Sequence, residues 1–276
     1  MTRFLCAALL LAGLSAPALA QFPDKNLAAA VQAALRLPKP EFKDDDLAKL
    51  SVLDITGKGV KDLTGLEKCK GLAQLKATKN EIAKLDALKD MPVLQSLDLE
   101  NNKVADIAPL AGLAKLQYLE LTNNQVADLK PLAKLTALAS LYLTKNKVAD
   151  VTPLADLTKL ASLNLGDNQI KDIKPLAKLT RVTTLELSGN PITDMSPLGA
   201  WTDLKLLMAD RCKVADLGPV VKWAKADADG PKRFAPYLRL YVAGNPLSDE
   251  GKKQLAELKK IGVRVDIRPV ASARQN

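Results

Sequence analysis

An amide side chain recurs every 22 residues along much of this 276-residue chain, and Lys58 and Cys212 occupy the same slot one period further out at either end. The members of this column are Asn80, Asn102, Asn124, Asn146, Asn168 and Asn190. A strict period of about 20 to 50 residues is the signature of a solenoid, in which each coil packs only against its neighbours. The period therefore limits the fold before any secondary structure is assigned.

Apolar residues fill two further columns, two residues apart in each period. This alternation is typical of a short strand with one buried face. Strands of successive coils must stack in parallel about 4.8 Å apart, so nine coils predict a concave sheet roughly 40 Å long. The two columns are Leu53, Leu75, Leu97, Leu119, Leu141, Leu163, Leu185, Leu207 and Leu240, and Ile55, Ala77, Leu99, Leu121, Leu143, Leu165, Leu187, Ala209 and Val242.

Polar and proline columns mark the turns of each coil. The asparagines follow the strand, where a buried amide can satisfy backbone groups that the turn removes from the sheet. Each aspartate precedes a short turn and can accept N–H groups two and three residues further on; a calcium ladder is the alternative. The prolines fix a short extended or 3₁₀ segment on the convex side. These last columns are Asp62, Asp106, Asp128, Asp150, Asp172, Asp194 and Asp216, and Pro109, Pro131, Pro153, Pro175, Pro197 and Pro219.

Both ends of a solenoid need covers, and helix signals stand at both ends of the repeats. Asp24 is the predicted N-cap of a first helix, a second short helix is expected near 44–46, and Ser248 begins a helix that Gly262 ends. We predict a signal peptide (1–20), an N-terminal helical cap (21–46), about nine coils (47–247), a C-terminal cap helix and strand (248–267) and a flexible tail (268–276).

One interval departs from the period. Cys212 and Asn245 are 33 residues apart, so 11 extra residues are inserted near 224–234. We predict that Ala226 to Arg233 form a loop projecting from the rim. Insertions in repeat proteins often lie on the binding face, and a tolerated surface insertion is the alternative.

The N-terminus has the features of a secretory signal. Arg3 precedes an apolar run, and Ala18-Leu19-Ala20 predicts cleavage after Ala20. No later run is long and apolar enough to span a bilayer, so we expect a periplasmic or secreted protein. Cys69 and Cys212 remain after cleavage, six coils or ~29 Å apart, too far for a disulfide.

The repeat L-x-x-L-x-L-x-x-N-x-[LIV], as in Leu94 to Val104, resembles the 22-residue leucine-rich repeats of bacterial internalins. It is similar also to those of the regulatory subunit of type 1 protein phosphatase. Phe22-Pro23-Asp24 with Leu27 and Val31 resembles the helical cap before such repeats in secreted bacterial proteins. The resemblance implies an α/β, right-handed leucine-rich repeat solenoid that binds another protein through its concave face.

Side chains beside the inward leucines are predicted to form that concave face. We expect its early part to be acidic and its later part apolar, with tyrosines as contact residues, because they bury much area with few rotors. An ordinary solvated face is the alternative. The candidate partner-binding residues are Asp98, Tyr118, Glu120, Tyr142, Asn164, Glu186, Met208 and Tyr241.

Net charge indicates a second possible function. Without Arg3, the predicted mature chain has 39 basic and 31 acidic residues, a surplus of eight. Its lysine-rich surface could bind anionic envelope polymers or lipid head groups, as an envelope-associated structural protein. A solubilising shell is the simpler explanation. We expect no specific nucleic-acid binding and a monomer.

The composition argues against catalysis. The chain contains no histidine, which excludes Ser-His and Cys-His pairs and histidine metal sites. Asp98 and Glu120 lie on neighbouring predicted strands, yet an open sheet excludes water poorly. We predict no enzymatic activity, no metal and no cofactor.

Overall fold

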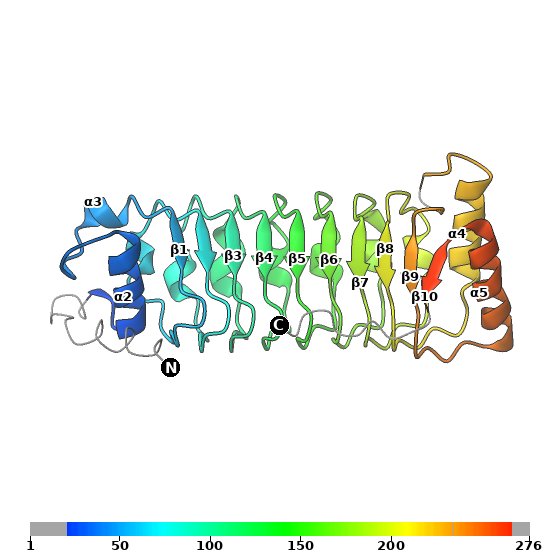
Figure 1. Ribbon diagram of the computed structural model, residues 1–276, viewed down its shortest axis with the longest axis horizontal. Helices are drawn as coiled ribbons and strands as arrows, with labels where there is room; N and C mark the ends of the chain where they lie inside the picture. Colours follow the sequence, from blue (N-terminus) through cyan, green and yellow to red (C-terminus); the bar gives the residue numbers. More distant parts are fainter. Residues whose placement is uncertain (1–20, 234, 267–276) are drawn as a thin grey trace, which may run out of the picture. The chain divides into compact units, whose positions relative to one another are not determined.

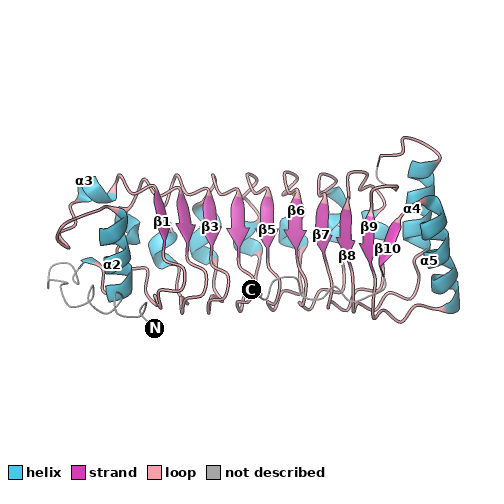
Figure 2. Ribbon diagram, viewed as in Figure 1, coloured by secondary structure: helices cyan, strands magenta, loops and turns pink. Residues whose placement is uncertain are grey.

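The computed structural model describes residues 21–233 and 235–266 (Figure 1). They fall into two compact units: unit 1 comprises residues 21–126 and 130–138, and unit 2 comprises 127–129, 139–233 and 235–266. Each unit is a stack of coils with a three-residue strand on one side and a short helical turn on the other (Figure 2). The predicted α/β leucine-rich repeat solenoid is confirmed. The predicted domain boundaries stay predictions, and the signal peptide and tail (268–276) lie outside the described residues.

Unit 1 contains four parallel strands. Leu53 pairs with Leu75, Leu75 with Leu97, and Leu97 with Leu119, so the 22-residue period fixes the register. The elements in chain order are α2 (Lys25–Ala34), α3 (Asp44–Leu47), β1 (Val52–Asp54), η2 (Leu66–Lys68), β2 (Gln74–Lys76), η3 (Asp86–Leu88), β3 (Ser96–Asp98), η4 (Ala108–Gly112), β4 (Tyr118–Glu120) and η5 (Lys130–Leu132).

Unit 2 contains six parallel strands and two longer helices. The register follows the period up to β8, then steps over the insertion to pair Leu207 with Leu240. The elements are β5 (Ser140–Tyr142), η6 (Thr152–Leu154), β6 (Ser162–Asn164), η7 (Lys174–Lys178), β7 (Thr184–Glu186), η8 (Ser196–Leu198), β8 (Leu206–Met208), α4 (Gly218–Ala228), β9 (Arg239–Tyr241), α5 (Asp249–Ile261) and β10 (Arg264–Asp266).

The apolar columns form the core of each unit. Every leucine of the first column is at most 1% exposed, from Leu53 to Leu240. Cys69 is also fully buried, as expected for a side chain that shares a column with leucines, and burial raises the pKa of its thiol to about 12. No single coil could bury these side chains alone, so stacking supplies the interior.

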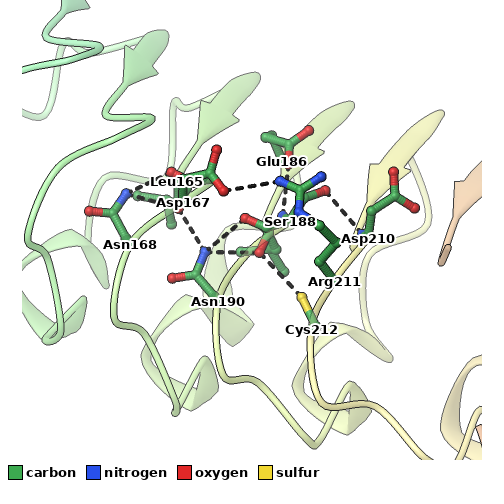
Figure 3. Close-up of polar contacts among 11 residues, drawn as sticks. Leu165, Asp167, Asn168, Glu186, Ser188, Asn190, Asp210, Arg211 and Cys212 are labelled. Atoms are coloured by element: carbon green, nitrogen blue, oxygen red, sulfur yellow. Dashed lines mark hydrogen bonds and ion pairs between the residues drawn. The ribbon is translucent and has the colours of Figure 1, made fainter. Parts of the chain in front are cut away.

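The asparagine column forms a hydrogen-bonded ladder between coils. The Asn190 side chain donates from Nδ2 to the carbonyls of Leu165 and Leu187, both at 2.8 Å (Figure 3). Its Oδ1 accepts the Ile170 N–H at 3.0 Å. Asn168 repeats this pattern one coil earlier. The interpretation that these amides satisfy backbone groups of the turn is therefore confirmed.

The residue before each ladder position adopts the left-handed conformation that favours glycine. Its φ is 57° at Asn101 and 49° at Asp167, and Gly189 takes the position one coil later with φ 72°. The sequence shows no uniform residue type at this position, and this feature was not predicted. Each non-glycine residue held there costs roughly 1 kcal/mol or more, which the ladder hydrogen bonds offset.

The aspartate column caps the convex turns. Asp106 accepts the N–H of Ala108 at 2.8 Å, and Asp194 accepts that of Ser196 at 2.7 Å, two residues on in both cases. The prolines then enter 3₁₀ segments, as predicted, because a fixed φ suits the first turn of a helix. Among residues 21–233 and 235–266, no cluster of carboxylates could hold a metal ion.

Asp24 joins the N-terminal helix to the first coil of unit 1. Its Oδ1 accepts the N–H groups of Asn26 and Leu27, which makes it the N-cap of α2. Its Oδ2 accepts the N–H groups of Lys61 and Asp62 at 2.7 and 3.2 Å. One carboxylate thus fixes the helix start against the turn of the first coil.

The insertion in unit 2 begins in a helix, which corrects the first three residues of the predicted loop from Ala226 to Arg233, whereas 229–233 form turns and bends. Pro219 stands in the first turn of α4, and the helix continues to Ala228 because Trp223 and Ala224 on one face are buried. The extra length therefore converts the usual 3₁₀ segment into an 11-residue α-helix.

A buried carboxylate organises the return from this helix. Asp227 is 4% exposed and accepts the N–H groups of Arg233 at 2.9 Å and Ala235 at 2.8 Å. Its own carbonyl accepts the N–H of Lys232 at 2.8 Å. These bonds turn the chain back toward β9 without a long unsupported loop.

The C-terminal helix follows the predicted signals. The Ser248 side chain accepts the Gly251 N–H, and Gly262 ends α5 in the left-handed conformation with φ 109°. Helices α4 and α5 lie side by side at the end of unit 2 (Figures 1 and 2). They cover the apolar end that the last coils would otherwise expose.

Candidate functional site

Strand alternation gives each unit a solvent-facing side of its sheet, here called the outer face. It consists of the first and third residues of each strand, which flank the inward leucine, and most of them are half-buried. The eight predicted partner-binding residues all lie on it. Asp98, Tyr118 and Glu120 belong to unit 1, and the other five belong to unit 2. The set is thus divided between the two units.

In unit 1, Asp98 and Glu120 are register partners on β3 and β4. Asp98 accepts the Thr78 hydroxyl at 2.7 Å and the Glu100 N–H at 3.1 Å. Glu120 accepts the Thr122 N–H at 2.7 Å and is only 6% exposed. Both carboxylates thus accept hydrogen bonds from their own turns, and Asp98 also accepts one from the preceding coil.

Burial makes this surface less acidic than its sequence indicates. It raises the pKa of Glu120 to about 7, because desolvation disfavours the charged carboxylate more than the Thr122 hydrogen bond favours it. Asp98 and Glu100 add repulsion in the same direction. Tyr118, at the first position of β4, is half-buried and is the aromatic residue of this surface.

In unit 2, the third residues of adjacent strands form one row. Tyr142 pairs with Asn164, Asn164 with Glu186, Glu186 with Met208, and Met208 with Tyr241. Parallel pairing places neighbours in the row about 4.8 Å apart. The structure therefore brings these five predicted residues together in a single line.

Glu186 and Asn164 make the middle of this row polar. Glu186 accepts the Ser188 N–H at 2.7 Å, and burial raises its pKa. The Asn164 Oδ1 is buried and has no hydrogen-bond partner within the described residues. Met208 and Tyr241 follow as the apolar pair of the row, and Asp266 of β10 is the next register partner.

The ends of the unit 2 strands are braced by a polar network (Figure 3). Arg211 forms an ion pair with Asp167 at 3.0 Å, and Asp210 accepts the Ala243 N–H. The Ser188 hydroxyl accepts the Asp210 N–H at 3.0 Å. These contacts hold the outer face rigid at its C-terminal edge, which lowers the entropy cost of binding.

A cluster of residues that the sequence analysis did not bring together lies at the N-terminal ends of strands β8, β9 and β10 in unit 2. Lys205, Leu206, Tyr237, Arg239 and Arg264 line a cavity of about 370 Å³, here called the basic pocket. Arg239 and Arg264 are register partners 25 residues apart, with α5 between them, so the 22-residue period does not align them.

Groups that could carry covalent chemistry are poorly placed. Cys212 is 4% exposed, its Sγ donates to the Leu187 carbonyl at 3.4 Å, and burial raises its pKa to about 11. It therefore replaces one donor of the asparagine ladder and stays protonated near neutral pH. That the protein is no enzyme and needs no cofactor stays a prediction.

No helix in the described part of the chain combines the length and apolar character needed to cross a membrane.

Comparison with known sequences finds matches to the repeats. Residues 114–156 and 158–200 match the family described as Leucine Rich repeats (2 copies). Internalin J of Listeria monocytogenes is 39% identical to this chain over 66 residues. That stretch is 24% of this chain and only 7% of the length of internalin J.

Solved structures extend the similarity. Internalin C2 of L. monocytogenes is 33% identical with a TM-score of 0.72, covering 74% of this chain and 91% of that one. The functional domain of internalin J, described as including a cysteine ladder, is 25% identical with a TM-score of 0.67, covering 87% of this chain and 54% of that one. A leucine-rich repeat protein of Leptospira interrogans is 19% identical with a TM-score of 0.65, covering 81% and 62%, and it shares the fold.

Proposed function

This chain belongs to the internalin-like leucine-rich repeat proteins of bacteria, and we propose that it binds another protein noncovalently through its outer face, which we expect to be concave. The observation that carries the proposal is the row on unit 2. There, Met208 and Tyr241 stand side by side and half-buried on β8 and β9, above a fully packed core. Such rigid, partly apolar side chains are typical interface anchors.

The rest of the row supplies the polar contacts that an interface needs. Asn164, Glu186 and the first-position residues Ser162 and Thr184 offer hydrogen-bonding groups between the apolar positions. Because the strands are fixed in register, these groups are presented without reorganisation of the backbone. Tyr118, with Asp98 and Glu120, forms the corresponding surface of unit 1.

Loss of the apolar anchors is the direct test. We expect the Met208→Ala, Tyr241→Ala double variant to bind its ligand at least about tenfold more weakly, because each residue supplies central apolar area. The assay is crosslinking and pull-down from the envelope fraction of the native organism, followed by titration of the captured protein. Unchanged affinity in a folded variant would contradict the proposal.

Lysine variants provide the matched control. Lys159 and Lys171 are exposed on the turns, and Lys159→Ala, Lys171→Ala should leave capture unchanged. The alternative function, envelope binding through the lysine-rich surface, predicts the reverse: capture that collapses at high salt, weakens in the lysine variant and survives the Met208 and Tyr241 changes.

We also propose that the protein acts in the periplasm or outside the cell. Arg3 and the apolar run before Ala18-Leu19-Ala20 support it, although they lie outside the described residues. Mass spectrometry of the protein from the native organism should find Gln21 as the first residue. A retained Met1 in the mature protein would refute cleavage.

A further inference from the structure

The basic pocket lies at one edge of the outer face of unit 2. Leu206, Arg239 and Arg264 are the first residues of β8, β9 and β10, and they are register partners across the three strands. Lys205 precedes Leu206, and Tyr237, which is 63% exposed, completes the lining. Three residues from separate strands and two from the segments leading into them thus converge on one hollow of about 370 Å³.

The arrangement concentrates positive charge. Arg239 and Arg264 stand about 4.8 Å apart on adjacent strands, a placement in which like charges repel. Neither arginine, nor Lys205, has a carboxylate within ion-pairing distance in the part of the chain that the structure describes. The acid nearest to Lys205 in sequence, Asp203, is paired with Arg233 at 2.9 Å. Asp266 lies two residues after Arg264 on β10 and is the register partner of Tyr241. An oxyanion between the guanidinium groups would remove this repulsion.

The chemistry of the lining selects the kind of ligand. Guanidinium groups donate in pairs to the two oxygens of a carboxylate, and Lys205 adds a mobile cation. Leu206 and Tyr237 give the pocket an apolar wall. A ligand that carries a carboxylate next to apolar groups would therefore contact both the cationic side chains and the apolar wall of the pocket.

The charge does not continue along the sheet. The first-position row runs from the pocket through Thr184, Ser162 and Ser140, and the parallel row through Met208 and Glu186. A long anionic polymer needs a track of cations, and these two rows offer none. A polypeptide needs only one acidic position beside apolar contacts, which Met208 provides.

We propose that the basic pocket binds an aspartate or glutamate side chain in an acidic segment of the protein ligand. This inference rests on the proposed function, because it places the acidic segment beside the Met208 and Tyr241 anchors. The pocket then fixes the register and orientation of the ligand, as charged pairs at an interface edge do.

The test uses a synthetic 12-residue peptide of alternating Glu and Leu, and its Gln isostere. Backbone chemical shifts of the isotope-labelled protein should move at Arg239 and Arg264 with the Glu peptide, and the Gln peptide should bind at least tenfold more weakly. The Arg239→Gln, Arg264→Gln variant should lose at least tenfold in affinity. The matched Lys159→Gln, Lys171→Gln variant removes the same charge and should bind as the wild type does.

Three outcomes would overturn the assignment. They are an absence of shifts at the pocket, equal affinity in the arginine variant, and tighter binding of inorganic phosphate or phosphatidylglycerol vesicles than of the Glu peptide through the same arginines. The Met208→Ala, Tyr241→Ala capture assay is independent. If the Met208→Ala, Tyr241→Ala variant loses capture and the Glu peptide causes no chemical-shift changes at the pocket, the outer-face function is supported and the pocket assignment is rejected. If the peptide causes shift changes but capture by this variant is unchanged, the pocket assignment is supported and the outer-face function is rejected.

Discussion

Replacing Asn190 by alanine is expected to lower the free energy of unfolding by about 2 to 6 kcal/mol. Asn190 is 1% exposed, and the change would leave the N–H of Ile170 buried without a partner, while the carbonyls of Leu165 and Leu187 would each lose one of two donors and keep Asn168 and Cys212. The unpaired N–H costs about 1 to 3 kcal/mol, and each lost hydrogen bond costs about 0.5 to 1.5 kcal/mol. The effect spreads across coils, because the three groups belong to two neighbouring repeats. Urea denaturation followed by circular dichroism measures the loss.

The natural substitution in the next coil supplies a graded control. Cys212 keeps one donor, to Leu187 at 3.4 Å, and has no amide oxygen to accept an N–H. Asn190→Cys should therefore cost less than Asn190→Ala, and Cys212→Asn should stabilise the protein by about 1 kcal/mol. An Asn190→Ala protein with the wild-type urea midpoint would show that the ladder contributes little.

Replacing Glu120 by glutamine is expected to stabilise the protein above neutral pH and to flatten its pH dependence. In the folded state burial raises the pKa of Glu120 from 4.5 to about 7, so folding holds a proton that the unfolded chain releases. This contribution is fully present below pH 4.5 and is lost as the pH rises through about 7. The loss is limited to about 1.4 kcal/mol per pH unit, or about 3 kcal/mol in total. Glutamine keeps the acceptor for the Thr122 N–H.

Thermal or urea unfolding of both proteins between pH 4 and 8 tests this prediction. The stability difference in favour of Glu120→Gln should grow as the pH rises. Glu81 is the control of opposite sign, because its hydrogen bond to Lys103 lowers its pKa. The advantage of the wild type over Glu81→Gln should shrink as the pH falls. Parallel stability curves for wild type and Glu120→Gln would contradict the buried-carboxylate account.

The repeat could be predicted in detail because every coil repeats the same packing problem. One column of leucines fixes the strand, and one column of asparagines fixes the turn, so spacing alone located residues such as Leu163 and Asn168 correctly. The conformation before each asparagine escaped notice, because Asn101, Asp167 and Gly189 share a backbone geometry and no side-chain type.

Features without a repeat were harder to predict. Helix α4 is stable only if one of its faces packs against other elements of the fold, and the sequence of the segment alone does not show which elements these are. The burial of Glu120 depends on neighbours from other coils, and so does its raised pKa. The basic pocket needs Arg239 and Arg264 to be aligned across a break in the period. In each case, the missing information was which residues of different coils meet.

Because Asp227 closes the turn that follows α4, the insertion is stabilised by its own contacts and does not disturb the pairing of the neighbouring strands. The segment that contains the extra residues is anchored on both sides: α4 begins at Gly218, and the buried carboxylate of Asp227 accepts the Ala235 N–H. Beyond the anchors, β8 and β9 still pair in register. Length can therefore be gained or lost at this position during evolution, or by design, while the adjoining coils keep their spacing. The solenoid can grow sideways here without growing longer.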